Sequence, residues 1–149
     1  MSKIILTGGA GYIGSHIAVS LVEHGFHPVI LDNFSTSDKK VIEALKTLTK
    51  NRLSAFETDC RDWKAVLKIM RSQGEITGVI HLAAYKAVGE SVEEPLKYYD
   101  NNIGSLLGIA SAMEMAQIKN FVFSSSCTVY GTPEEQPVFE STPWEKAFS

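Results

Sequence analysis

The chain has 149 residues, which is enough for one domain and too few for two comfortable ones. Its 14 basic and 17 acidic residues give a formal net charge of -3, so it lacks the clustered basic excess typical of a nucleic-acid partner. It has no run of eighteen apolar residues and no signal-peptide stretch, which argues against a membrane partner. Its two cysteines, Cys60 and Cys127, are too few and too far apart for a disulfide framework, and we expect a soluble, cytoplasmic protein.

Short apolar, β-branched runs recur along the chain and predict strands over residues 3–7, 28–32, 53–57, 77–82 and 120–124. The first four start about 25 residues apart, which is the spacing of βαβ units. Runs this apolar suit parallel strands covered by helices on both faces. The sequence therefore predicts an α/β fold: a Rossmann-like, doubly wound parallel sheet, truncated after about five strands.

Helices are predicted between these strands, over residues 12–24 and 39–50, after a capping Asp62, and from residue 95 to about residue 117. The last of these carries apolar residues spaced by threes and fours, as an amphipathic helix does. Residues 131–149 contain three prolines and several acids, and we expect a loop there that ends without a further element.

A glycine-rich segment, Gly8-Gly9-Ala10-Gly11-Tyr12-Ile13-Gly14, joins the first predicted strand to the first predicted helix. In this context glycines let the backbone approach a pyrophosphate, which the free N–H groups and dipole of the helix start would bind. Asp32 lies 18 residues beyond Gly14, at the end of the second strand. There its carboxylate would accept hydrogen bonds from the adenosine ribose hydroxyls and would repel a 2′-phosphate. NAD is thus favoured over NADP. The alternatives are a βα turn without a ligand and an ordinary turn aspartate.

The register Thr7-Gly8-x-x-Gly11-x-x-Gly14 resembles the glycine motif of the extended short-chain dehydrogenases/reductases. Three further segments resemble UDP-glucose 4-epimerases in order and spacing: Lys86-Ala-Val-Gly-Glu-Ser91, Pro95-Leu-x-Tyr-Tyr-Asp-Asn-Asn102 and Phe123-Ser-Ser-Ser-x-Thr-Val-Tyr-Gly131. The resemblance covers essentially the whole chain. It implies NAD as cofactor and UDP-glucose and UDP-galactose as substrates of the full-length enzyme, with hydride transfer at sugar C4 through a 4-keto intermediate. It is compatible with a homodimer as the assembly of the full-length enzyme.

The resemblance also implies cofactor-binding residues. In chain order they are Gly8, Gly11, Tyr12, Ile13, Gly14, Asp32, Asn33, Phe34, Ser35, Thr36, Ser37, Asp59, Cys60, Leu82, Ala83, Ala84, Tyr85, Lys86 and Asn101. Tyr12 and Ile13 would contact the pyrophosphate through their backbones, and Asp59 and Cys60 would lie at the adenine. Lys86 would lie near the nicotinamide ribose. Without the resemblance, Asp59 reads as a helix cap, Lys86 as a solvated loop lysine and Asn101 as a surface helix residue.

Ser126 follows the fifth predicted strand, at the edge of the sheet where open α/β folds hold their ligands. The resemblance assigns it a hydrogen bond to the sugar 4-hydroxyl, beside a tyrosine base within a Tyr-x-x-x-Lys motif. None of the five tyrosines has lysine four residues later, so we expect this motif and the substrate-binding region to lie beyond Ser149. The 149 residues would then be an incomplete NAD-binding domain. A run of hydroxyls capping the strand end is the alternative for Ser126.

Two other functions remain open. A nucleotide-sugar 4,6-dehydratase shares the glycine motif, but dehydratases typically carry Asp-Glu where this chain has Cys127-Thr128, which supply no carboxylate. A non-catalytic dinucleotide-sensing module is the second alternative, if the natural gene ends at Ser149. The four histidines form no recognised ligand cluster with the cysteines, so no metal site is expected.

Overall fold

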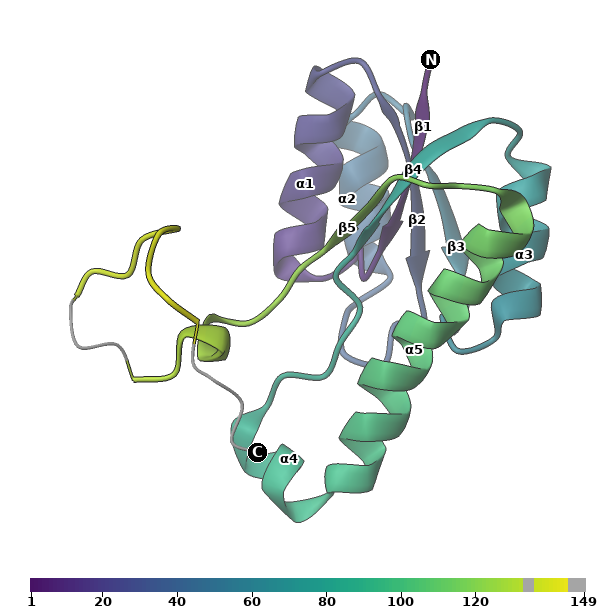
Figure 1. Cartoon of the computed structure of the whole chain (residues 1–149). Coiled ribbons are helices and arrows are strands. Elements are labelled where there is room, and N and C mark those ends of the chain that lie inside the picture. Colours follow the sequence, from purple (N-terminus) through teal and green to yellow (C-terminus); the bar gives the residue numbers. More distant parts are fainter. Residues whose placement is uncertain (133–135, 145–149) are drawn as a thin grey trace.

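A computed structural model describes residues 1–132 and 136–144, so part of the loop predicted after residue 130 lies outside the described residues. Its centre is a parallel sheet in the order β3-β2-β1-β4-β5 (Figure 1). The strands are β1 (Lys3–Thr7), β2 (His27–Asp32), β3 (Ser54–Glu57), β4 (Ile76–His81) and β5 (Phe121–Phe123). The predicted fold class is confirmed, and each strand boundary lies within one residue of its predicted position.

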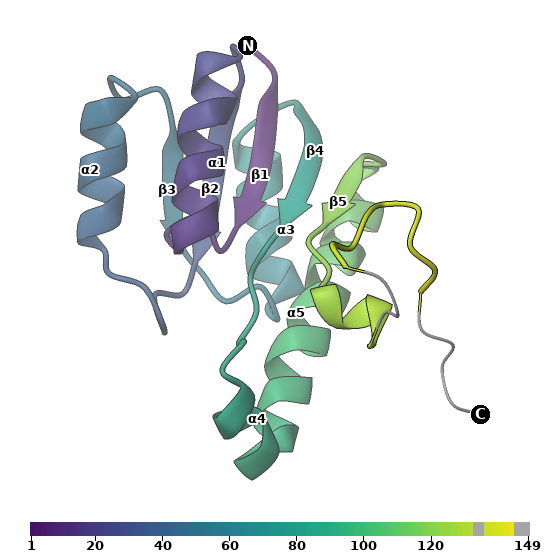
Figure 2. The same ribbon diagram turned by 90° about the vertical axis from the view of Figure 1, so that its left-hand side faces the viewer.

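Helices cover both faces of the sheet between its two edges, β3 and β5 (Figure 2). Helices α1 (Tyr12–Glu23) and α2 (Lys40–Leu48) lie on one face, while α3 (Trp63–Ser72) and α5 (Pro95–Ala116) lie on the other. Successive side chains of a strand point to opposite faces. Thus Ile5 of β1 packs in the core under α3 and α5, and its neighbour Leu6 packs in the core under α1 and α2.

One short helix, α4 (Val88–Glu93), was not predicted. It is held against α5 by Glu90, whose carboxylate accepts the Tyr98 hydroxyl at 2.7 Å and pairs with Lys97 at 2.5 Å. The Lys97 hydrogen bond is the main reason why the pKa of Glu90 lies below its usual value. These partners stand seven and eight residues away, on the next helix, so a search for periodicity within the segment itself finds no helix there.

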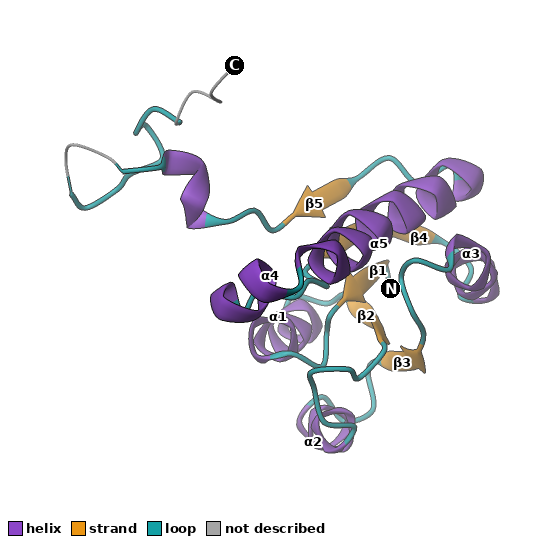
Figure 3. Ribbon diagram, turned by 90° about the horizontal axis from the view of Figure 1, so that it is seen from below, coloured by secondary structure: helices purple, strands orange, loops and turns teal. Residues whose placement is uncertain are grey.

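All five strands run in the same direction, so their carboxyl ends meet at one edge of the sheet (Figure 3). The chain leaves β1 toward β2 and β3, then returns to place β4 on the other side of β1. The loops that follow β1 and β4 therefore diverge at a topological switch point, where open α/β sheets bind their ligands. No helix in the described part of the chain has both the length and the apolar character to cross a membrane.

Close packing of α5 on the loop after β3 depends on Gly108. A Cβ built at this position would lie 2.1 Å from the Cys60 carbonyl oxygen, which is rigid backbone. We predict that Gly108→Ala lowers the free energy of unfolding in urea by about 2–3 kcal/mol through overpacking. Gly89→Ala is the matched control because Gly89 lies in α4 with nothing within 4 Å of its added Cβ. The control should be neutral or slightly stabilising, and an equal loss in both variants would contradict the prediction.

Candidate functional site

A cleft that is open to solvent lies at the carboxyl edge of the sheet. Its walls come from the loops after β1, β2, β3 and β4 and from the first half of α5. The lining residues are Gly8, Gly11, Leu31, Asp32, Asn33, Ser35, Thr36, Ser37, Thr58, Asp59, Cys60, Leu82, Ala83, Ala84, Tyr85, Asn101 and Ser105.

Asp32 is the buried carboxylate of the cleft, at the end of β2. One of its oxygens accepts the Ala10 N–H of the glycine loop at 2.9 Å. The other accepts the Phe34 N–H at 2.9 Å and the Ser37 hydroxyl at 3.0 Å. A single side chain therefore fixes both the β1–α1 loop and the β2–α2 loop.

Close backbone approaches require glycine at two positions, Gly8 in the β1–α1 loop and Gly14 in the first turn of α1. Gly8 has a φ of +66°, and a Cβ there would lie 2.9 Å from the Ala83 nitrogen. A Cβ on Gly14 would lie 2.3 Å from the Gly8 carbonyl oxygen. Gly14 does not line the cleft but lets α1 pack closely on the loop, which brings the helix start to the cleft.

The N-terminus of α1 has backbone donors for an anion. Gly11 is its N-cap residue and has no side chain to accept them. The N–H groups of Tyr12, Ile13 and Gly14 have no acceptor among the described residues. The side chains of Tyr12 and Ile13 are exposed and do not line the cleft.

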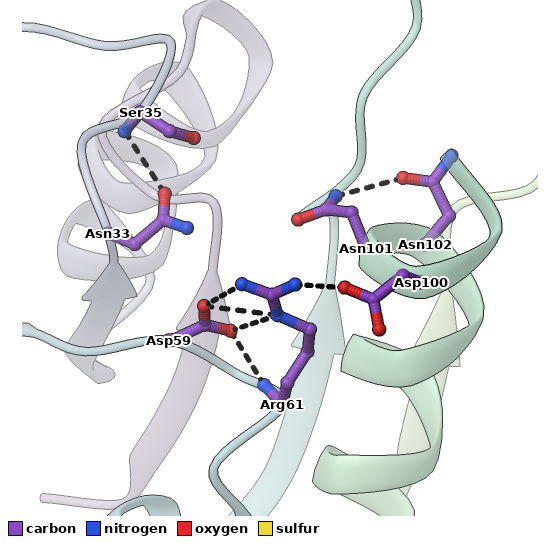
Figure 4. Close-up of polar contacts among 7 residues, drawn as sticks. All are labelled: Asn33, Ser35, Asp59, Arg61, Asp100, Asn101 and Asn102. Atoms are coloured by element: carbon purple, nitrogen blue, oxygen red, sulfur yellow. Dashed lines mark hydrogen bonds and ion pairs between the residues drawn. The ribbon is translucent and has the colours of Figure 1, made fainter. Parts of the chain in front are cut away.

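The wall after β3 is tied to α5 by an ionic bridge (Figure 4). Arg61 donates from Nε to both oxygens of Asp59 at 3.1 Å and from Nη2 to one of them at 2.6 Å, and its Nη1 binds Asp100 of α5. The hydrogen bonds from Arg61 hold the pKa of Asp59 below its usual value. Asp59 is therefore ionised where it lines the cleft, and its orientation depends on α5.

The wall after β4 is held by Asn102, which the sequence did not single out. Its side chain accepts a hydrogen bond from the Tyr85 N–H at 2.8 Å and donates one to the Tyr85 carbonyl at 3.0 Å. Asn102 therefore bonds both backbone polar groups of Tyr85. Asn101, which lines the cleft, donates its side-chain N–H to the Asn102 oxygen at 2.9 Å (Figure 4). No local sequence signal marks Asn102, because its partner Tyr85 lies 17 positions earlier in the chain.

Some of the residues expected at the cofactor do not line the cleft. Phe34 has a φ of 55°, and its side chain packs against the core under α1 and α2. Lys86 is exposed on the loop that leads to α4. Ser126 is exposed beyond β5 and caps the 3-10 helix η1 (Cys127–Tyr130), accepting the Thr128 N–H at 3.3 Å and the Thr128 hydroxyl at 3.0 Å.

Three residues that the sequence did not indicate also line the cleft: Leu31, Thr58 and Ser105. Leu31 and Thr58 each precede an expected residue at a strand end, and Ser105 lies four positions after Asn101, one helical turn along α5. Within residues 1–132 and 136–144, no group of three or more His, Cys, Asp or Glu could hold a metal ion.

Comparisons with known proteins relate the chain to nucleotide-sugar enzymes. A family model described as GDP-mannose 4,6 dehydratase matches residues 5–147. A UDP-glucose 4-epimerase of Neisseria meningitidis serogroup B is 46% identical over 143 residues, which are 96% of this chain and 42% of the relative. A UDP-glucose 4-epimerase of Klebsiella pneumoniae is 45% identical over 139 residues, which are 93% of this chain and 99% of the relative's sequence.

A solved structure extends the similarity to three dimensions. The UDP-glucose 4-epimerase of Stenotrophomonas maltophila, with bound NAD and formylated UDP-arabinopyranose, superposes with a TM-score of 0.90 at 39% identity. The match covers 97% of this chain and 43% of that one. The chain thus spans about two fifths of the length of the Neisseria and Stenotrophomonas proteins.

The reactivity of Cys60 tests whether its side chain is buried in the folded protein. It is 5% exposed, and burial, with the nearby carboxylates of Asp59 and Asp32, raises the pKa of its thiol to about 12. Since the thiolate is the reactive form, we predict that iodoacetamide at pH 8 labels Cys60 about a hundredfold or more slowly in the folded protein than in urea. The measurement uses a Cys127→Ser background, with Cys60→Ser added as the blank. Equal rates with and without urea would contradict the buried placement.

Proposed function

The chain belongs to the UDP-glucose 4-epimerase family, and we propose that it is the NAD-binding part of an enzyme that interconverts UDP-glucose and UDP-galactose. The observation that carries the proposal is the cleft itself. It joins a glycine loop at an uncapped helix N-terminus to a buried carboxylate at the next strand end. These are the parts that a dinucleotide requires: backbone donors for its pyrophosphate and an acceptor for its ribose.

The residues of the cleft fit NAD at each of these parts. The N–H groups of Tyr12, Ile13 and Gly14 are free to bind the pyrophosphate, and Gly11 leaves room for it because a glycine presents no Cβ. When bound, NAD supplies a hydride acceptor and donor for the sugar C4. The chain's own part is to orient the dinucleotide at the carboxyl edge of the sheet.

Asp32 supports the choice of NAD over NADP. A carboxylate offers about four lone-pair directions, and three protein donors use three of them here. One direction is left for a ribose hydroxyl. A 2′-phosphate at the same place would meet a buried negative charge in a partly desolvated site, so like charges would repel.

Ser126 is proposed as the residue that bonds the sugar 4-hydroxyl in the intact enzyme. Its oxygen accepts two bonds from Thr128, so its own proton remains available to a ligand. A serine is a poor base at neutral pH, and no tyrosine of this chain has a lysine four positions later. We therefore propose that residues 1–149 are an incomplete Rossmann domain, and that a Tyr-x-x-x-Lys motif and a substrate-binding region follow it in the intact enzyme.

The dehydratase named by the family model is the second candidate. Elimination of water needs an acid and a base near the sugar, which dehydratases typically supply with an Asp-Glu pair before Val-Tyr-Gly. This chain has Cys127-Thr128 at those positions and no carboxylate, which favours the epimerase. A cytoplasmic location belongs to the same proposal and rests on the sparse, widely separated cysteines.

We predict that calorimetric titration detects NAD binding to the chain, with NADP at least about tenfold weaker, and that Gly11→Val abolishes binding. An added Cβ at Gly11 meets one neighbour, the Gly8 carbonyl oxygen at 3.2 Å, so the variant should fold while its side chain occupies the pyrophosphate position. Gly89→Ala is the control that should bind NAD normally. Unchanged NAD affinity in Gly11→Val defeats the loop assignment, and affinities for the two cofactors within about threefold contradict the role of Asp32.

We predict that residues 1–149 alone do not interconvert UDP-galactose and UDP-glucose in a coupled assay, even with NAD bound. A longer version that continues through the next Tyr-x-x-x-Lys motif and the substrate region should be active, because a tyrosine base and sugar positioning are then present. Ser126→Ala in the longer version should lower kcat by about a hundredfold or more. Turnover by the short chain would show that the base lies within these 149 residues.

A further inference from the structure

Thr7 and His81 form a buried pair where β1 and β4 end. They are partners in the register of these two strands, and they are 0% and 2% exposed. The Thr7 oxygen Oγ1 lies 2.8 Å from Nδ1 of His81. The same oxygen accepts the backbone N–H of Leu82 at 3.1 Å and of Ala83 at 3.2 Å. One hydroxyl thus contacts a ring and the first two residues of the cleft wall after β4.

The hydrogen-bond count fixes the direction of each bond. A hydroxyl has two acceptor lone pairs and one proton, and both lone pairs of Thr7 are taken by N–H groups. Its proton is therefore left for His81, so Nδ1 must be the acceptor and the ring proton must sit on Nε2. Burial lowers the pKa of His81 to about 4, which keeps the ring neutral at physiological pH. The Phe123 ring stacks on the imidazole at 6.0 Å between centroids, on the side toward β5.

The other states of the ring would disturb the hydrogen bonds that the Thr7 hydroxyl makes. A proton on Nδ1, in the opposite tautomer or in the charged ring, would make Nδ1 a third donor toward an oxygen with two lone pairs. One donor would then have to leave the Thr7 oxygen, and the Thr7 proton would lose Nδ1 as its acceptor. The Leu82 N–H has a second acceptor, the Thr7 carbonyl at 3.3 Å, whereas the Ala83 N–H has none among the described residues. The Leu82 N–H could therefore leave this oxygen and keep one hydrogen bond, whereas within the described part of the chain the Ala83 N–H depends on the Thr7 hydroxyl alone.

The position of Ala83 matters because it lies against the glycine loop. A Cβ on Gly8 would come within 2.9 Å of the Ala83 nitrogen, so the two backbones are already at contact distance. Leu82, Ala83, Gly8 and Gly11 all line the cleft. A shift of Ala83 would therefore change the opening where the glycine loop meets the β4 loop.

We propose that Thr7 and His81 are a positioning pair for the cleft: His81, as the neutral Nε2–H tautomer, orients the Thr7 hydroxyl so that it holds Leu82 and Ala83 against Gly8 in the geometry that admits a dinucleotide. The last clause rests on the proposed function, whereas the tautomer and the restraint of Ala83 do not. Neither residue touches the ligand in this proposal.

The test begins with the chain free of nucleotide. Long-range ¹H–¹⁵N NMR of the ¹⁵N-labelled protein at pH 7 should show His81 as the Nε2–H tautomer, with the Ala83 amide protected from hydrogen exchange. Thr7→Val removes the hydroxyl and keeps the shape, so the Ala83 amide should exchange at least about tenfold faster and NAD affinity, measured by calorimetry, should fall about tenfold. Thr7→Ser restores the hydroxyl and should bring both values back to within about twofold of the wild type.

An Nδ1–H tautomer or a charged ring in the wild type overturns the proposal, and so does a Thr7→Val variant that keeps both Ala83 protection and NAD affinity. If Thr7→Val does not fold, the wild-type tautomer and the Thr7→Ser values decide the matter, and a serine variant that loses the Ala83 protection refutes the role of the hydroxyl. Absence of NAD binding by the folded wild type would refute the proposed function instead, while the NMR results still test the pair.

Discussion

The carboxylate of Asp32 connects the two loops that make the cleft a binding site. It accepts one hydrogen bond from the glycine loop and two from the β2–α2 loop, so the positions of the two loops are coupled. A buried carboxylate is stable in this place because these donors replace the water that it has lost. The shape of the cleft therefore depends on a charge that also faces the proposed ribose.

Close approaches between backbone segments also shape the cleft. Gly8 lies against Ala83, Gly14 against Gly8, and Gly108 against Cys60, each at a distance that a side chain would not allow. The first two bring the glycine loop to the β4 loop and to α1, and the third brings α5 onto the loop after β3. The cleft is thus bounded by backbone on several sides, which suits a ligand that is recognised through N–H groups and shape.

The sequence predicted the parts of this architecture that local patterns encode. Strand positions followed from apolar runs, and the cleft residues at the ends of β1, β2 and β4 followed from their places after those strands and from the family resemblance. Helix α4 was missed because the contacts of Glu90 with Lys97 and Tyr98 stabilise it from the neighbouring helix. Phe34 remains a predicted cofactor residue, but its partly buried side chain packs against the core under α1 and α2, and no sequence pattern reports its positive φ.

Side-chain networks were equally invisible in the sequence. The hydrogen bonds between Asn102 and Tyr85 join residues 17 positions apart. The bond between Thr7 and His81 joins residues 74 positions apart. A pattern of residue types contains no sign of such pairs. They become apparent only when the strand register and the path of α5 are known, because these two features bring the partners together.

The proposed binding site and the proposed catalytic serine lie in differently packed parts of this chain. The cleft is built from β1 to β4 and α5, whose inner residues form the two buried cores. Ser126 follows β5, where Phe121, Val122 and Phe123 are all exposed although parallel sheets normally have both faces covered. Its local position is set by hydrogen bonds with Thr128 and η1, and among the described residues it makes no hydrogen bond to the cleft lining. The proposed dinucleotide site therefore rests on elements that are packed on buried cores, whereas Ser126, the proposed contact for a sugar, follows a strand whose side chains are exposed.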